Sequence, residues 1–147
     1  MATYVKLAGF VEHLAEGVHD LGSDQLKVAL SNTAPSAESS PTHLLTANCI
    51  LANVTQVAYT YCSTRNITTS ASSQSSGTYK LVLTDLVLTA SGGSIGPFRY
   101  IYIYNDTPSS PADPLIAYYD YGASITLLDG ETLTLDFSAS NGLLQVA

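Results

Sequence analysis

Charged residues are scarce in this chain. Asp, Glu, Lys and Arg make up 12% of its 147 residues, about half the usual share for a soluble globular domain. The surface must therefore be built largely from Ser, Thr, Asn and Tyr, which protect poorly against association. This composition suggests a protein that works inside an assembly. A secreted or otherwise stable β domain with a Thr- and Ser-rich surface fits the composition equally well.

Basic residues are the scarcest of all. Five Lys and Arg stand against twelve Asp and Glu, which gives a formal net charge of -7. The five cations are scattered along the chain: Lys6, Lys27, Arg65, Lys80 and Arg99. Binding to a phosphate backbone requires clustered cations. We therefore expect no nucleic-acid partner.

Long apolar runs are also missing. No stretch approaches the roughly 18 apolar residues of a membrane span. The first residues lack a basic segment followed by an apolar run, because Glu12, His13 and Glu16 interrupt it. These features predict no membrane partner, and synthesis and folding in a cytoplasm.

The chain has two cysteines, Cys49 and Cys62. Two are too few for a zinc site, which needs about four ligands. They could face each other across a hairpin and form a disulfide outside the cell. In a chain made in the cytosol, free and partly buried thiols are favoured.

One amphipathic helix is predicted, over residues 4–21. Its apolar residues follow the spacing of a single helical face: Leu7, Phe10, Val11, Leu14, Val18 and Leu21. Gly22 stands where a helix-ending glycine is common. Gly9 and Gly17 each weaken the helix by about 1 kcal/mol relative to alanine. Such a helix should form only when it is docked on another element.

From residue 25 onward the pattern is that of strands. Asp129-Gly130 and Asn141-Gly142 are hairpin-turn signals between apolar alternations. Asp85 marks a bend, and part of the Ser- and Thr-rich tract 63–78 is expected to form an edge strand. The other predicted strands are 26–30, 54–62, 79–89, 98–104, 115–121, 125–128, 133–137 and 143–146. We predict one domain, residues 1–147, an all-β antiparallel β-sandwich (jelly-roll-like) with one N-terminal helix.

Residues 92–96, GGSIG, match the G-x-S-x-G pattern of a serine hydrolase nucleophile elbow. Such an elbow needs a helix after the serine, but PFRYIYIY follows, which is a strand pattern. The histidines of the chain, His13, His19 and His43, all precede Ser94, whereas a hydrolase of this type has its histidine after the serine. We therefore interpret GGSIG as a glycine turn and expect no catalytic residues.

No metal or cofactor site is predicted. His13 and His19 are six residues apart, roughly 240° around a helix, and should face different ways on its surface. Asn105, Asp106 and Asp113 lie in an oxygen-rich loop that could hold a weak calcium ion. Because this loop matches no defined calcium motif, a proline-stiffened surface loop is favoured.

Tyrosine is abundant: the chain has ten, and no tryptophan. In the strand 98–104 the aromatic residues share one face, and Ile101 and Ile103 share the other. The isoleucine face is easier to bury, because each buried tyrosine hydroxyl needs a partner. The tyrosine face could then contact a neighbouring subunit or a saccharide, or its rings could instead stiffen the sheet as cross-strand pairs. The predicted assembly contacts are Phe98, Tyr100, Tyr102, Tyr104, Tyr118, Tyr119 and Tyr121.

Several segments of the chain carry a resemblance to a known group of proteins. They are FVEHLAEGVHDLGSDQLKVALSNTAP at 10–35, SSGTYKLVLTD at 75–85, and SGGSIGPFRY with YNDTPSSPADPLI within 91–116. With these segments the chain resembles small virion structural proteins of tailed bacteriophages, and most of all capsid decoration (cement) proteins.

The resemblance implies a non-enzymatic protein without cofactors that stabilises the head. It would lie on the capsid exterior after assembly in the host cytoplasm. Its partners would be the major capsid protein and copies of itself, as a dimer or trimer. The alternative is a tail- or fibre-associated β-sandwich binding module, either lectin-like or an adaptor.

Overall fold

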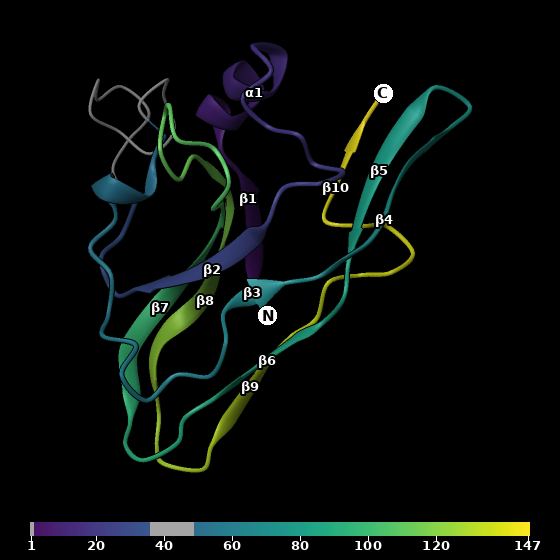
Figure 1. The fold of residues 1–147 in the computed structure, drawn as a ribbon. Helices are drawn as coiled ribbons and strands as arrows, with labels where there is room; N and C mark the ends of the chain where they lie inside the picture. Colours follow the sequence, from purple (N-terminus) through teal and green to yellow (C-terminus); the bar gives the residue numbers. More distant parts are fainter. Residues whose placement is uncertain (1, 36–48) are drawn as a thin grey trace.

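The protein has an all-β, antiparallel, sandwich-like fold (Figure 1). The structure is a computed structural model that describes residues 2–35 and 49–147. Within these ranges there is one α-helix, and none of the helices there is long and apolar enough to cross a lipid bilayer. The fold class predicted from the sequence is therefore confirmed.

The larger sheet forms one layer. It contains, in spatial order, β1 (Thr3–Lys6), β8 (Leu115–Leu127), β7 (Ile95–Asn105), β2 (Leu26–Ser31) and β3 (Asn66–Ile67). All neighbours are antiparallel, and β7 and β8 form its long central hairpin. Their alternating apolar and aromatic residues suit such a ladder. The predictions of strands at 26–30, 98–104 and 115–121 are confirmed.

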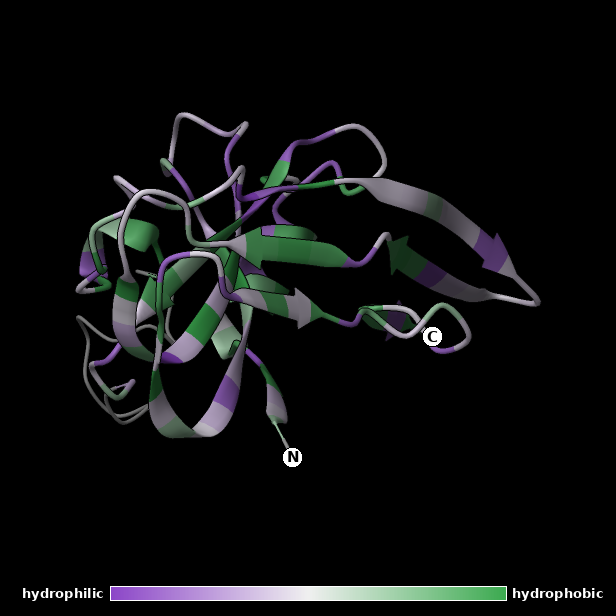
Figure 2. Ribbon diagram, turned by 90° about the horizontal axis from the view of Figure 1, so that it is seen from below, coloured by the Kyte–Doolittle hydropathy of each residue, from purple (hydrophilic) through white to green (hydrophobic). Residues whose placement is uncertain are grey.

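The second layer consists of two small sheets. One contains β10 (Leu144–Val146), β5 (Thr78–Leu83) and β4 (Thr69–Ser75), and the other pairs β6 (Leu86–Thr89) with β9 (Thr132–Leu135). Asp85 separates β5 from β6, and its side chain accepts a hydrogen bond from Phe137 N at 2.8 Å. The predicted bend and edge strand are therefore confirmed. The sequence of β4 is TSASSQS, and in Figure 2 the hairpin of β4 and β5 extends away from the green, hydrophobic centre.

The helix α1 (Ala8–Ala15) is shorter than the predicted helix over residues 4–21. Residues 3–6 instead form β1, whose backbone pairs with β8. At the other end Gly17 has a φ of +76°, which takes the chain out of the helix. The helix packs Phe10 and His13 into the core.

Residues 54–62 do not form the strand predicted for them. A short 3-10 helix, η1 (Leu51–Asn53), precedes an irregular path that is tied to β2. Val57 N donates to Leu30 O at 3.0 Å, and Leu30 N donates to the Tyr59 hydroxyl at 2.8 Å. These isolated hydrogen bonds, and not a β-ladder, hold the segment against β2.

Candidate functional site

The aromatic residues of β7 are buried inside the chain. Phe98, Tyr100, Tyr102 and Tyr104 are 0%, 8%, 0% and 3% exposed. The prediction that they form an exposed contact face is therefore wrong for these four residues. Ile101 and Ile103 are buried as well, so β7 is covered on both faces.

The physical reason is a second cover over the tyrosine face. Val54, from the irregular segment, borders the same small cavity as Tyr102. Burial raises the pKa of Tyr104, and the charge of the neighbouring Arg65 acts in the opposite direction. The Arg65 guanidinium also lies 3.8 Å from the centre of the Tyr59 ring. The rings of Tyr100 and Tyr102 pack against Tyr118, with centroids 6.2 and 5.5 Å apart. The arrangement matches the alternative interpretation of the tyrosine face, in which its rings form cross-strand pairs within the sheet.

The other predicted contact residues, on β8, remain accessible. Tyr118 and Tyr119 are half-buried, and Tyr121 is 40% exposed. Tyr119 and Tyr121 border a depression of about 260 Å³, which we call the aromatic groove. Its lining is Ala2, Ile101, Tyr119, Tyr121, Leu133, Thr134, Leu135, Asp136 and Phe137.

The aromatic groove joins residues from three strands and the segment after β9. Tyr4 of β1 packs on Tyr119 at 5.3 Å between centroids, and Phe137 packs on the same ring at 6.4 Å. Burial, with a contribution from the charge of Asp136, raises the pKa of Tyr119. Burial likewise raises the pKa of Tyr4 well above its usual value. Both hydroxyls are therefore neutral at physiological pH, and the groove offers rings, hydroxyls and one carboxylate.

A groove of this composition suits contact more than chemistry. Aromatic rings provide large apolar faces at a small conformational cost, and tyrosine is enriched at protein interfaces. The nearby Arg99 is already engaged, since it donates to both carboxylate oxygens of Asp120 at 2.7 and 2.9 Å. The residues from β9 were not predicted as part of a site. Their alternation predicts a strand, but not the neighbour of that strand.

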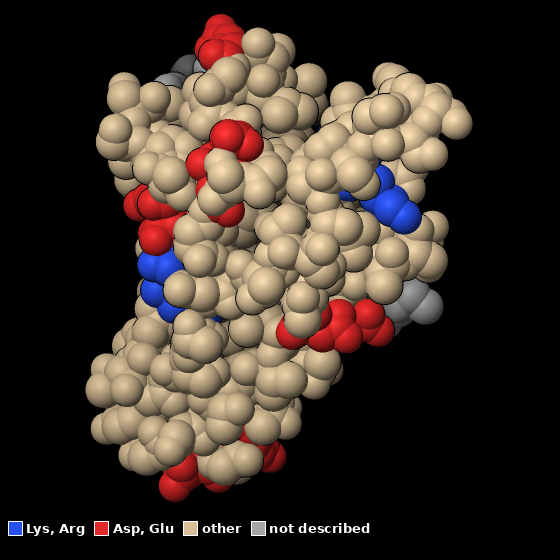
Figure 3. Space-filling model, turned by 45° about the vertical axis from the view of Figure 1, so that its right-hand side comes forward, with Lys and Arg blue, Asp and Glu red and all other residues tan. Residues whose placement is uncertain are grey.

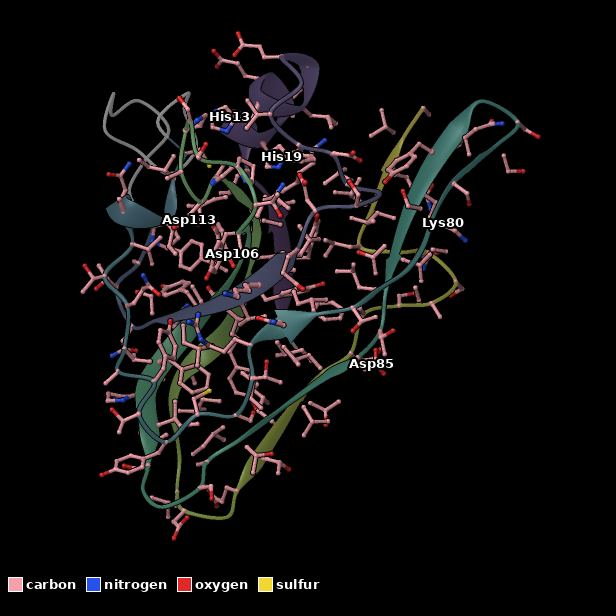
Figure 4. The ribbon with its side chains drawn as sticks, in the orientation of Figure 1. His13, His19, Lys80, Asp85, Asp106 and Asp113 are labelled. Atoms are coloured by element: carbon pink, nitrogen blue, oxygen red, sulfur yellow. The ribbon has the colours of Figure 1, made fainter. Side chains whose placement is uncertain are left out.

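The two histidines of the described chain lie together, contrary to the prediction that they face apart on a helix surface. His19 lies beyond the end of α1, and the chain turns back so that the rings of His13 and His19 are 6.1 Å apart (Figure 4). Both side chains are buried, at 4% and 7% exposure. The remaining histidine, His43, lies outside the described residues.

His19 belongs to a buried polar network. Asn105 Nδ2 donates to His19 Nδ1 at 3.2 Å and to Asp24 Oδ2 at 2.5 Å. Burial, and then the charge of His13, lower the pKa of His19 to about 4, although Asp24 acts in the opposite direction. His19 is therefore neutral at pH 7 and contributes to the packing of α1.

The loop 105–114 does not gather its oxygens around one point. Asn105 is buried in the network with His19, whereas Asp106 forms an ion pair with Lys27 at 2.6 Å. Burial and the charge of Asp106 raise the pKa of Asp113. Across residues 2–35 and 49–147, no group of three or more His, Cys, Asp or Glu residues is placed to hold a metal ion.

The glycine turn and the cysteines agree with their predictions. Ser94 is exposed and is followed directly by β7, so a strand stands where an elbow would need a helix. Cys49 is buried and Cys62 is partly buried, and both thiols are free. Burial raises the pKa of Cys49 to about 12, which keeps it protonated.

Comparison of the chain with protein-family models, curated proteins and solved structures finds no match.

Proposed function

We propose that this protein is a non-enzymatic structural component of a tailed-bacteriophage virion, a decoration protein that binds the outer capsid lattice and stabilises the head. Its partners are the major capsid protein and copies of itself. The observation that carries the proposal is the aromatic groove, with Tyr121 at its surface and neutral hydroxyls around it. The resemblance of the sequence to small virion proteins supports the same function.

The scarcity of surface charge favours association. Most of the surface seen in Figure 3 is neither acidic nor basic, and the acidic side chains form small separate patches. Burial of such a surface requires little desolvation of charge. Each square ångström of apolar surface buried contributes about 25 cal/mol, and a lattice repeats a modest contact many times. Small interfaces can therefore add up to resistance against internal pressure.

The second candidate is a binding module on a tail or fibre. The aromatic rings of the groove, together with Asp136 and Thr134, are the kinds of group on which a sugar ring can stack and form hydrogen bonds. This candidate uses the same groove for a different partner. The two candidates therefore differ in what the purified protein binds.

The test uses capsids that lack the protein. The wild-type chain should bind them saturably and raise the temperature at which the shells release DNA. Tyr121→Ser, which removes the exposed ring of the groove, should weaken binding about tenfold, the loss expected for an aromatic contact at an interface. Tyr61→Ser is the matched control, because Tyr61 is similarly exposed at 44% and does not line the groove.

Two results would contradict the capsid proposal. The first is that no binding to the capsids occurs. The second is that Tyr61→Ser and Tyr121→Ser weaken binding equally. Binding to a glycan array that is lost in Tyr121→Ser would favour the tail or fibre module.

A further inference from the structure

Strand β4 is the longest edge strand of the described sheets. It has seven residues, whereas the other edge strands, β1, β3, β6, β9 and β10, have two to four. With β5 it forms a hairpin, residues 69–83, which extends away from the hydrophobic centre (Figure 2) and which we call the β4–β5 arm. Within the described residues, β4 pairs with β5 on one side and with no strand on the other.

The free edge of β4 lacks the features that usually prevent an edge strand from pairing. Natural proteins protect such edges with charged side chains, with proline, with bulges or by keeping the strand short. The sequence of β4, TSASSQS, has neither a charged residue nor a proline. Its one bulge, between Thr69 and Ala71, lies at the end away from the tip of the arm. Residues 71–75 therefore form an unprotected edge.

The turn at the tip of the arm determines which main-chain groups of β4 point to this edge. Ser76 and Gly77 have φ values of +51° and +85° and form a two-residue turn that is closed by Ser75 and Thr78. The closing pair of such a turn is hydrogen-bonded across the hairpin. In an antiparallel ladder, bonded residues alternate with residues whose N–H and C=O groups point away from the partner strand. The residues one and three positions before Ser75 therefore point outward.

These outward residues are Gln74 and Ser72. Across residues 2–35 and 49–147, no main-chain hydrogen bond outside the strand ladders reaches either of them. Their side chains are held within the arm: the Ser72 hydroxyl is hydrogen-bonded to the Tyr79 hydroxyl at 2.8 Å, and Gln74 Oε1 accepts from Gly77 N at 3.2 Å. The main-chain N–H and C=O groups of both residues are therefore available to a further strand.

We propose that the free edge of β4 pairs with the same edge of a second copy of this chain, antiparallel, about a twofold axis beside Ser73. In this register Ser72 of each copy lies opposite Gln74 of the other, and the two pairs exchange four main-chain hydrogen bonds. Both copies use the same surface, as a closed twofold dimer requires. One sheet then runs through both copies.

Neighbouring registers do not use both outward residues of each copy. Pairing Ser72 with Ser72 would bring Gln74 opposite Ser70, which lies in the bulge. Pairing Gln74 with Gln74 would bring Ser72 opposite Ser76, whose φ of +51° is not that of a strand. The bulge at one end and the turn at the other therefore select the register centred on Ser73.

Charge and shape favour a second copy as the partner. Residues 71–75 are Ser, Ala and Gln, so no like charges oppose each other when the edge meets itself. The one charged residue of the arm, Lys80, is on β5 and donates to Ser140 O. In the antiparallel pair the tip of each arm reaches the level of Ser70 of the other copy, which is still within the arm. The contact therefore needs only the two arms.

This inference does not depend on capsid binding. The free edge of β4 and the aromatic groove have no residue in common. Capsids could fail to bind the chain while the dimer forms, and the reverse. The two experiments therefore test separate claims.

Disulfide trapping tests the contact and its register. In the proposed dimer the two copies of Ser73 form a non-hydrogen-bonded pair with Cα atoms about 4.5 Å apart, which a disulfide can span. Ser73→Cys should therefore give a cross-linked dimer under mild oxidation. Ser75→Cys is the matched control, since Ser75 is also exposed and lies on the same face of β4. Its two copies are four residues out of register, roughly 14 Å apart, and should cross-link at least about tenfold more slowly.

Gln74→Pro tests the main-chain pairing. The N–H of Gln74 points to the free edge, so proline removes a donor that β5 does not use. Sedimentation equilibrium should show a concentration-dependent dimer for the wild type and a monomer for Gln74→Pro at the same concentrations. The wild type in the oxidation experiment measures any cross-linking through Cys62, which is free and partly buried.

Three results would overturn the proposal: a wild-type chain that stays monomeric, equal cross-linking of the two cysteine variants, or a dimer that persists in Gln74→Pro. If Gln74→Pro does not fold, the comparison of Ser73→Cys with Ser75→Cys still decides the question.

Discussion

At the scale of single residues, burial of His19 makes the stability of the fold dependent on pH. Its side chain is 7% exposed and accepts a hydrogen bond from Asn105 in its neutral form. The pKa of His19 is about 4 in the folded chain, compared with 6.5 for an ordinary histidine. The unfolded chain therefore binds this proton first as the pH falls. The stabilisation is complete above pH 6.5 and is lost progressively towards pH 4.

The prediction concerns His19→Gln, which cannot titrate. Between pH 7 and pH 4, wild-type stability should fall by about 3 kcal/mol more than that of the variant. Urea unfolding of both proteins at the two pH values measures the difference. Asp113 and Asp120, whose pKa values are also shifted, titrate in both proteins. Their contributions to the pH dependence of stability therefore cancel when the two proteins are compared. Equal pH dependence in the two proteins would show that His19 is not the group responsible.

At the scale of elements, the turn before β10 determines where β10 lies beside β5. Gly142 N donates to Ser138 O, and Leu143 N donates to Leu81 O, each at 2.7 Å. Gly142 has a φ of +73°, and a Cβ at this position would collide with Leu81 O. Gly130, in the other hairpin turn, has a φ of +86° but open space around it.

Two alanine variants separate the effect of the positive φ from the effect of the close approach to Leu81 O. Gly130→Ala should lower the free energy of unfolding by about 1 kcal/mol, because of its backbone conformation alone. Gly142→Ala should lower it by at least about 2 kcal/mol, because β10 must also move away from β5. Thermal or urea unfolding gives both values. Equal losses would mean that the close approach to Leu81 does not constrain β10.

The elements differ in how far the sequence predicts them. Strands β2, β7 and β8 have local alternation long enough to define them, and the two glycine turns have specific turn residues. Strand β1 has four residues that also fit the start of a helical stripe, and it depends on pairing with β8, with Thr3 opposite Asp120. Residues 54–62 have the composition of a strand but find no ladder. Pairing between distant segments is not encoded in local periodicity.

Local periodicity predicts the candidate site only in part, for the same reason. Alternation correctly separates the tyrosine face of β7 from its isoleucine face, but it does not show what covers each face. The irregular segment that includes Val54 covers the tyrosines, and only Tyr118, Tyr119 and Tyr121 of β8 remain accessible. The aromatic groove itself needs β9 beside β8, which only the folded chain brings together.

At the scale of the whole molecule, the sandwich-like protein carries little charge: Asp, Glu, Lys and Arg make up 12% of its residues. Its surface has few cations, and two of them, Lys27 and Arg99, are ion-paired within the chain. The aromatic groove and the depression between α1 and the sheet of β10, β5 and β4 have no lining residue in common.

The most direct test of the virion proposal is the copy number of this protein in purified phage particles. Quantitative mass spectrometry against labelled peptides gives its ratio to the major capsid protein. A decoration protein should be present in numbers comparable to those of the major capsid protein. Absence from the particle, or a ratio typical of a tail or neck component, would contradict the account.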